Sequence, residues 1–175
     1  MDSINPIPND KRAPDFTLVD LTGTPHSLTD YRNRIVIINF WSAECPWSER
    51  CDVELLSLLE EWGKEVALIT IASNANEPQE MLLQVSTKRG LSTVLQDVDH
   101  ITADMYGAKT TPHLFVVDKK GILRYQGAFD NITFRQRDAT EHFLQAAVEK
   151  LFSGTHPEPA QTPPYGCILV RFTPE

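Results

Sequence analysis

Two continuous runs of apolar residues dominate the first half of the chain. Residues 35–40 read IVIINF and residues 66–71 read VALITI, and both runs are rich in β-branched side chains. Runs of this kind are typical of strands that are covered on both faces, and they indicate a largely parallel sheet. Because helices must cover such a sheet, the pattern predicts an α/β fold.

Amphipathic segments between and after these runs predict the helices. Apolar side chains recur at helical spacing in four segments, which cover residues 47–62, 78–89, 101–106 and 138–151. The last helix is expected to begin at Asp138, whose carboxylate can cap it together with Glu141 three residues later. Its buried positions are expected to be Ala139, Phe143, Ala146, Ala147 and Leu151.

Shorter apolar runs predict the remaining strands, which cover residues 15–21, 25–28, 93–96, 113–117 and 122–125. The first two form an N-terminal β extension. The last two flank the turn formers Asp118 to Gly121, and this arrangement predicts a β-hairpin that closes the sheet.

The 175 residues suit a single domain with an arm at each end. Residues 1–12 are expected to form an extended N-terminal arm, because prolines interrupt them and no hydrophobic period is present. Residues 13–152 carry the alternating strands and helices. Residues 153–175 hold five of the 12 prolines and are expected to wrap the domain as a tail, in which the apolar run 167–172 can add a short strand.

The charge balance excludes two classes of partner. The chain has 16 basic and 24 acidic residues, and its net charge of -8 repels nucleic acids and anionic membrane surfaces. No apolar stretch approaches the roughly 20 residues of a membrane span, and the N-terminus lacks a basic flank followed by an apolar run. We therefore expect a cytoplasmic protein.

Cys45 stands where a cysteine becomes reactive. It follows the apolar run 35–40 and precedes Pro46, a residue suited to the first position of a helix. The free amides and the dipole at a helix N-terminus stabilise a thiolate, which is the nucleophilic form of cysteine. We therefore interpret Cys45 as a nucleophile rather than as a small buried apolar residue.

The other two cysteines have different expected roles. Cys51 lies on the apolar stripe of the first helix and is therefore expected to pack in the core. A disulfide between Cys51 and Cys45 is not expected, because six residues of helix rise about 9 Å, which is too far for the bond. Cys167 lies in the tail, which is long enough to return to the active end of the sheet. It is either a resolving thiol for oxidised Cys45 or a buried apolar position, and the sequence leaves both open.

Two further positions bear on the chemistry of Cys45. Ser48 stands where a second thiol would complete a C-x-x-C motif, so its hydroxyl can hydrogen-bond the sulfur of Cys45 but cannot form a disulfide. The Thr111–Pro112 bond precedes an apolar strand. A cis isomer there would expose backbone groups to a substrate chain, and the alternative is a proline at the start of a strand.

No metal or cofactor site is expected. The five histidines are scattered, and no Cys or His pair has the spacing of a zinc site. Asp97, Asp99 and Asp104 lack the spacing of a calcium loop. The chain has no glycine-rich phosphate loop and no dinucleotide-binding fingerprint.

Four motifs carry a resemblance to a known family, and they are APDFTL at 13–18, INFW at 38–41 before Cys45-Pro46, Thr111-Pro112, and Val117-Asp118 before Gly121. Together they resemble the thioredoxin-fold redoxins of the alkyl hydroperoxide reductase/thiol-specific antioxidant family. The resemblance covers roughly residues 13–152 and implies a thioredoxin-like fold, in which helices flank a central mixed β-sheet. It also implies Cys45 as nucleophile, Pro112 as a cis-proline facing it, and no organic cofactor or metal. The ending TPPYGC at 162–167 is similar to the tail of a peroxiredoxin-like branch, which favours a role for Cys167.

These observations predict a thiol-dependent oxidoreductase in which Cys45 attacks a disulfide or a peroxide and is released by Cys167 or by an external thiol reductant. The residues expected to form the substrate site are Ser42, Pro46, Trp47, Ser48, Thr111 and Pro112. The partners would be a thiol or disulfide protein, or a small peroxide. Two alternatives stay open: a weak peroxidase, and a non-enzymatic binding module that keeps the fold to hold partners.

Overall fold

The computed structural model describes residues 7–172 of the chain. Its main strands are β1 (Thr17–Asp20), β2 (Pro25–Ser27), β3 (Ile35–Trp41), β4 (Val66–Ala72), β5 (Val94–Gln96), β7 (His113–Val117) and β8 (Leu123–Gly127). They form one seven-stranded sheet in the order β2-β1-β5-β4-β3-β7-β8. A second, two-stranded sheet joins β6 (Thr110–Thr111) and β9 (Cys167–Ile168).

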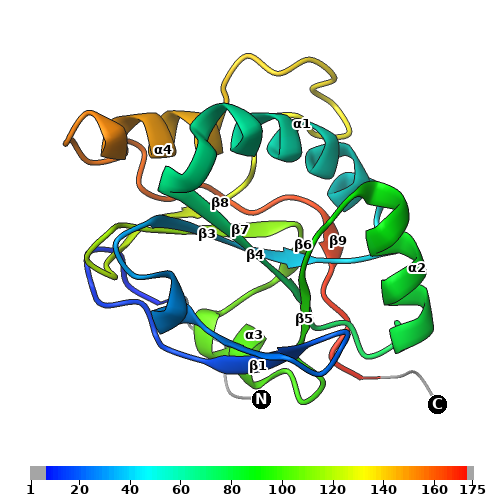
Figure 1. The fold of residues 1–175 in the computed structure, drawn as a ribbon. Helices are drawn as coiled ribbons and strands as arrows, with labels where there is room; N and C mark the ends of the chain where they lie inside the picture. The colour runs from blue at the N-terminus through cyan, green and yellow to red at the C-terminus, as the bar shows by residue number, and fades with distance from the viewer. Residues whose placement is uncertain (1–6, 173–175) are drawn as a thin grey trace.

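Helices cover both faces of the main sheet (Figure 1). They are α1 (Pro46–Trp62), α2 (Gln79–Arg89), α3 (Ile101–Tyr106) and α4 (Phe143–Phe152), with short 3-10 turns η1 (Leu28–Tyr31) and η2 (Gly63–Glu65). The side chains of α1 and α4 form one buried cluster with Ile35 and Ile37 of β3. Val36 and Ile38, which point the other way, pack with Ala103 and Tyr106 of α3. This is the α/β, thioredoxin-like fold with a central mixed sheet that the sequence predicts.

The sheet is less parallel than the apolar runs indicate. β3 pairs parallel with β4, and β4 pairs parallel with β5, but β3 pairs antiparallel with β7 and the remaining pairs are antiparallel as well. All seven residues of β3 are buried. A central strand is covered on both faces whatever the direction of its neighbours, so its apolar run does not determine the direction of β7.

The last helix begins later than the sequence predicts. Asp138 does not cap it, because α4 starts at Phe143 and His142 is its N-cap residue. Its buried side chains are Leu144, Ala147 and Val148, whereas the predicted Ala146 is exposed. The segment 131–142 forms hydrogen bonds of its own instead of a helical turn, including one from the Glu141 amide to the Asn131 side chain (3.2 Å).

The C-terminal tail lies against the domain along much of its length. The Thr162 amide donates to the carbonyl of Gln126 in β8 (3.1 Å). The strand β9 then pairs with β6, and it covers two residues of the predicted run 167–172. Beyond it, the Leu169 amide donates to the Lys109 carbonyl (3.0 Å), and the Val170 amide donates to the side chain of Asn74 (2.8 Å). The domain boundaries themselves stay a prediction.

No helix within residues 7–172 combines the length and the apolar character that crossing a membrane requires.

Candidate active site

Cys45 and Cys167 form a disulfide at the carboxyl end of β3. Their Cα atoms lie 6.1 Å apart, although 122 positions separate them in the sequence. Cys45 is 2% exposed, whereas Cys167 is partly exposed. The structure therefore brings together the two cysteines that the sequence associates with redox chemistry.

The end of β3 and the start of α1 hold Cys45. Cys45 is the N-cap residue of α1, Pro46 follows at the first helical position, and the Cys45 carbonyl accepts the Glu49 amide (3.1 Å). The free amides and the dipole at a helix N-terminus favour a negative charge nearby, and in the disulfide-bonded state the Cys45 side chain makes no capping hydrogen bond to them. Local sequence chemistry thus places the sulfur where its thiolate is stabilised.

A largely buried cation, Arg89, holds the loop before Cys45. Arg89 of α2 donates to the carbonyls of Ala43 (2.7 Å) and Ser42 (3.4 Å), and its guanidinium contacts the Asp52 carboxylate (3.2 Å). Asp52 also accepts the indole N–H of Trp41 (2.8 Å). This network links β3, α1 and α2 behind the cysteine, and it fixes the loop that aims the side chain of Cys45.

Burial changes the acidity of Asp52. The carboxylate is 2% exposed, and desolvation raises its pKa to about 6, although the hydrogen bonds from Trp41 and Arg89 act in the opposite direction. Desolvation is the largest cause because a charge in the interior loses its water. Asp52 therefore titrates in a range that a solvent-exposed aspartate does not reach.

A second carboxylate lies on the other side of the same loop. Ser42 donates its hydroxyl to Glu77 (2.5 Å), and the Glu44 amide donates to the same carboxylate oxygen (3.0 Å). Glu77 is buried, and its other oxygen has no hydrogen-bond partner among residues 7–172. The predicted substrate residue Ser42 is thus part of the support of the loop.

The segment Thr111–Pro112 faces Cys45 from the opposite side. The Thr111–Pro112 peptide bond is cis, and the Cys45 sulfur lies 3.0 Å from the Thr111 carbonyl oxygen. Thr111 pairs with Cys167 in the small β6–β9 sheet. A Cβ atom on Gly166 would collide with the Thr111 carbonyl, so the glycine allows the tail to approach this closely.

Two aromatic residues flank the disulfide. The rings of Trp47 and Tyr165 meet edge to face with their centroids 4.9 Å apart, and each residue lies two positions from one of the cysteines. The Tyr165 hydroxyl accepts the Phe134 amide (2.7 Å). Pro46 is exposed beside them. The side chain of Trp47 therefore contacts the tail rather than the interior.

Ser48 and Cys51 lie deeper than the site. Ser48 is fully buried, and its hydroxyl accepts the Ser42 amide (3.3 Å), a different partner from the Cys45 sulfur that the sequence suggests. Cys51 is 1% exposed within the α1 cluster, as expected, and burial raises the pKa of its thiol to about 12. Cys51 stays protonated at neutral pH and is a poor nucleophile.

Sequence reasoning missed Asp52, Glu77 and Arg89. Asp52 follows Cys51 on the buried stripe of α1, and this was the one available signal, because a carboxylate at a core position needs a partner. The partner Arg89 lies 37 residues away, and nothing in the local pattern connects the two.

Among residues 7–172, no group of three or more His, Cys, Asp or Glu side chains is placed to hold a metal ion. The chemistry that the site supports is carried by sulfur. Two cysteines that meet across a disulfide, one of them at a helix N-terminus, can exchange electrons with a thiol or disulfide.

Comparisons with known proteins agree with this geometry. A family model described as the AhpC/TSA family matches residues 10–126. The thiol-disulfide oxidoreductase ResA of Geobacillus thermodenitrificans is 34% identical over 113 residues, which cover 62% of this chain and 63% of that protein. The chain thus spans less than two thirds of the length of that curated relative.

Solved structures agree over a longer span. A hypothetical protein from Sinorhizobium meliloti 1021 superposes with a TM-score of 0.86 at 28% identity and covers 98% of both chains. The thioredoxin domain of a thiol-disulfide oxidoreductase from Bacteroides vulgatus superposes with a TM-score of 0.66 at 20% identity, over 83% of this chain and 98% of that one. At 20% identity, the superposition on the Bacteroides vulgatus domain shows that the two chains share a fold.

Proposed function

The chain belongs to the AhpC/TSA family, and from this premise we propose that it is a thiol-disulfide oxidoreductase with Cys45 as nucleophile and Cys167 as resolving thiol. The observation that carries the proposal is the Cys45–Cys167 disulfide at the start of α1. Relatives named thiol-disulfide oxidoreductase and thiol:disulfide interchange protein support it.

The reaction proceeds in two exchanges. The Cys45 thiolate attacks one sulfur of a substrate disulfide, forms a mixed disulfide, and releases the other substrate sulfur as a thiol after protonation. The Cys167 thiolate then attacks the Cys45 sulfur, which closes the internal disulfide and releases the second substrate thiol. Two electrons pass from the cysteine pair to the substrate, and an external dithiol returns them.

The substrate in this proposal is a protein disulfide. The tail shows that the Thr111 backbone accepts an extended strand beside Cys45, because β9 pairs there. In the cytoplasmic location expected from the sequence, reducing thiol pools regenerate the cysteine pair.

A peroxide is the second candidate substrate, because Cys45 is 2% exposed and a small oxidant reaches it with less opening of the tail than a protein does. The thiolate would attack one peroxide oxygen and break the O–O bond, which gives a sulfenic acid and releases the other oxygen as water or an alcohol after protonation. Cys167 would then condense with the sulfenic acid and release water.

Single cysteine variants test the proposal. Reduction of insulin disulfides by dithiothreitol would be followed with wild-type protein, Cys45→Ser, Cys167→Ser and Cys51→Ala. We expect Cys45→Ser to lose catalysis, because the nucleophile is gone. We expect Cys167→Ser to lose at least tenfold and to accumulate a mixed disulfide at Cys45. Cys51→Ala is the matched control and keeps the wild-type rate, because Cys51 is a core residue.

The same variants separate the alternatives. Unchanged turnover in Cys45→Ser would remove the oxidoreductase proposal. Inert wild-type protein that still binds disulfide proteins would establish a binding module. Peroxide consumption that depends on Cys45, with no action on insulin, would establish the peroxidase.

A further inference from the structure

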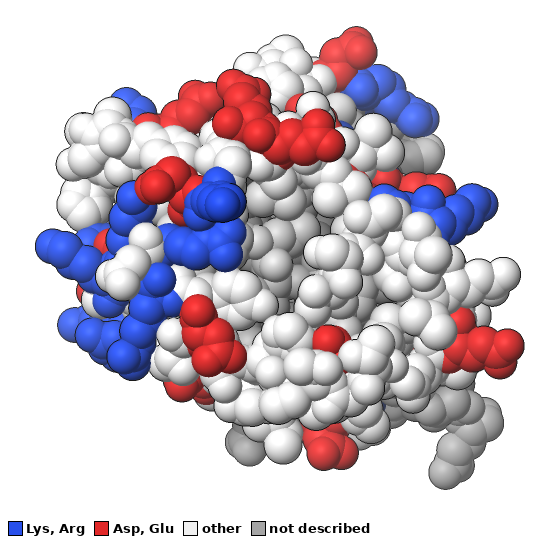
Figure 2. All heavy atoms as spheres, in the orientation of Figure 1, with Lys and Arg blue, Asp and Glu red and all other residues white. Residues whose placement is uncertain are grey.

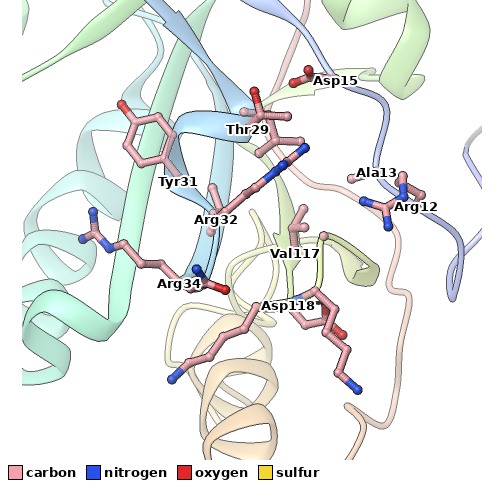
Figure 3. A pocket seen from close by; sticks show the side chains of 15 residues that line it. Arg12, Ala13, Asp15, Thr29, Tyr31, Arg32, Arg34, Val117 and Asp118 are labelled. Carbon is pink, nitrogen blue, oxygen red and sulfur yellow. Dashed lines mark hydrogen bonds between the residues drawn. The ribbon is translucent and has the colours of Figure 1, made fainter.

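Figure 3 shows a hollow of 670 Å³, which lies at the end of β3 opposite Cys45. β3 begins and β7 ends here, and the paired residues Val36 and Val117 belong to its lining. The hollow lies at the start of β3 and Cys45 follows its end, and a strand of seven residues spans about 20 Å. The volume lies within the roughly 300–1,000 Å³ that is usual for small-molecule sites.

Positive charge is concentrated around this hollow. Its lining includes five of the 16 Lys and Arg residues against two carboxylates, and the charged residues are Arg12, Arg32, Arg34, Lys119, Lys120, Asp15 and Asp118. Figure 2 shows that Lys and Arg side chains gather on this side of the molecule, over the start of β3 and the β7–β8 turn. The sign is opposite to the net charge of -8.

Two of the five cations already have partners. Arg34 donates to the carbonyl of Val66 (2.8 Å), and Lys119 pairs with Glu65. One of the two carboxylates is also engaged, since Asp118 accepts the guanidinium of Arg124 (2.7 Å). These contacts fix the walls of the hollow.

The other three cations are available to a ligand. Within residues 7–172, the side chains of Arg12, Arg32 and Lys120 form neither a hydrogen bond nor an ion pair with the protein. In Figure 3 the side chains of Arg12 and Arg32 reach from opposite walls into the space above Val117.

The turn is shaped to hold Arg12 in this position. The Ala13 amide donates to the Gly121 carbonyl (2.9 Å), which fixes the N-terminal segment against the β7–β8 turn. Gly121 has a φ of +83°, and a Cβ there would lie 3.1 Å from the Arg12 guanidinium. The glycine therefore serves both the turn and the space that the arginine occupies.

We propose that this hollow binds a small phosphorylated molecule through Arg12, Arg32 and Lys120. Guanidinium groups match phosphate oxygens in pairs, and an ammonium adds a third positive charge. Val36 and Val117, which line the hollow, receive the apolar part of the ligand. A long polyanion would also be repelled by the acidic rest of the surface. A small ligand stays within the positive hollow, because charge interactions are screened beyond a Debye length of about 8–10 Å.

Titration of the full chain with inorganic pyrophosphate tests the proposal, followed by amide shifts in NMR spectra. We expect saturable shifts confined to residues 11–15, 28–36 and 117–121. The double variant Arg12→Gln/Arg32→Gln should weaken binding at least tenfold. Arg135→Gln is the matched control, because this exposed arginine lies outside the hollow, and it should bind as the wild type does.

Three results would overturn the proposal. The first is the absence of saturable shifts in the wild-type protein, which needs no variant to fold. The second is an equal response to sodium chloride at matched ionic strength. The third is equal affinity for citrate, which would refute the assignment to phosphate. The test is independent of the thiol chemistry, since it applies to the oxidised protein and to Cys45→Ser alike.

Discussion

Asp52 shows how one side chain near the site couples stability to pH. Burial raises its pKa to about 6, above the value of about 3.9 in an unfolded chain. The folded state therefore holds the proton more tightly than the unfolded state does. The stability that this group contributes is fully present below pH 4 and is lost as the pH rises through about 6.

Asp52→Asn should remove this dependence. Two pKa units correspond to at most about 3 kcal/mol, so the free energy of unfolding of the variant, relative to the wild type, should rise by about 2–3 kcal/mol between pH 4 and pH 7.5. Urea unfolding at several pH values measures it. Glu49→Gln, which changes a more exposed carboxylate of the same helix, should show no such slope. A constant difference between Asp52→Asn and wild type would contradict the assignment.

The secondary-structure elements show what the pattern of the chain can predict. Helix α1 follows from apolar spacing, Pro46 and Gly63, because all of these signals are local. The start of α4 does not follow from local signals. Asp138 fits a capping pattern, but the segment 131–142 forms hydrogen bonds within itself instead of a helical turn. The run 167–172 predicts a strand where β9 lies, but it does not predict the partner β6, which is more than 50 residues away.

Gly166 controls how closely the tail packs against β6. Gly166→Ala should slow the formation of the Cys45–Cys167 disulfide at least tenfold, because the added Cβ collides with the Thr111 carbonyl. Quenching with an alkylating reagent at intervals after oxidant addition measures the rate. Ile168→Ala is the control, since Ile168 is 81% exposed, and it should close the disulfide at the wild-type rate. An unchanged rate in Gly166→Ala would show that the β6–β9 pairing is not needed.

At the scale of the whole molecule, the fold class and the redox cysteine could be predicted, but the charge asymmetry could not. The net charge follows from composition, whereas the positive hollow gathers Arg12, Arg32 and Lys120 from three separate segments. Tertiary structure alone brings them together. Tertiary structure also determines where the tail packs, because its contacts include β8, β6 and the loop after β4, which are separate in the sequence.

The disulfide joins positions 122 residues apart, so it turns most of the polypeptide into a closed ring. Loop-closure entropy for a ring of this size is worth on the order of 4–5 kcal/mol. We expect reduction to lower the midpoint of thermal unfolding by about 10 °C, measured by calorimetry with and without dithiothreitol. Cys167→Ser should show no response to the reductant. Equal midpoints for oxidised and reduced wild-type protein would contradict the expectation.

Because the free energies around a thermodynamic cycle sum to zero, folding favours formation of the disulfide by the same amount, which is about 10³-fold in the equilibrium constant for disulfide formation. Electron transfer and folding are therefore a single coupled equilibrium in this molecule.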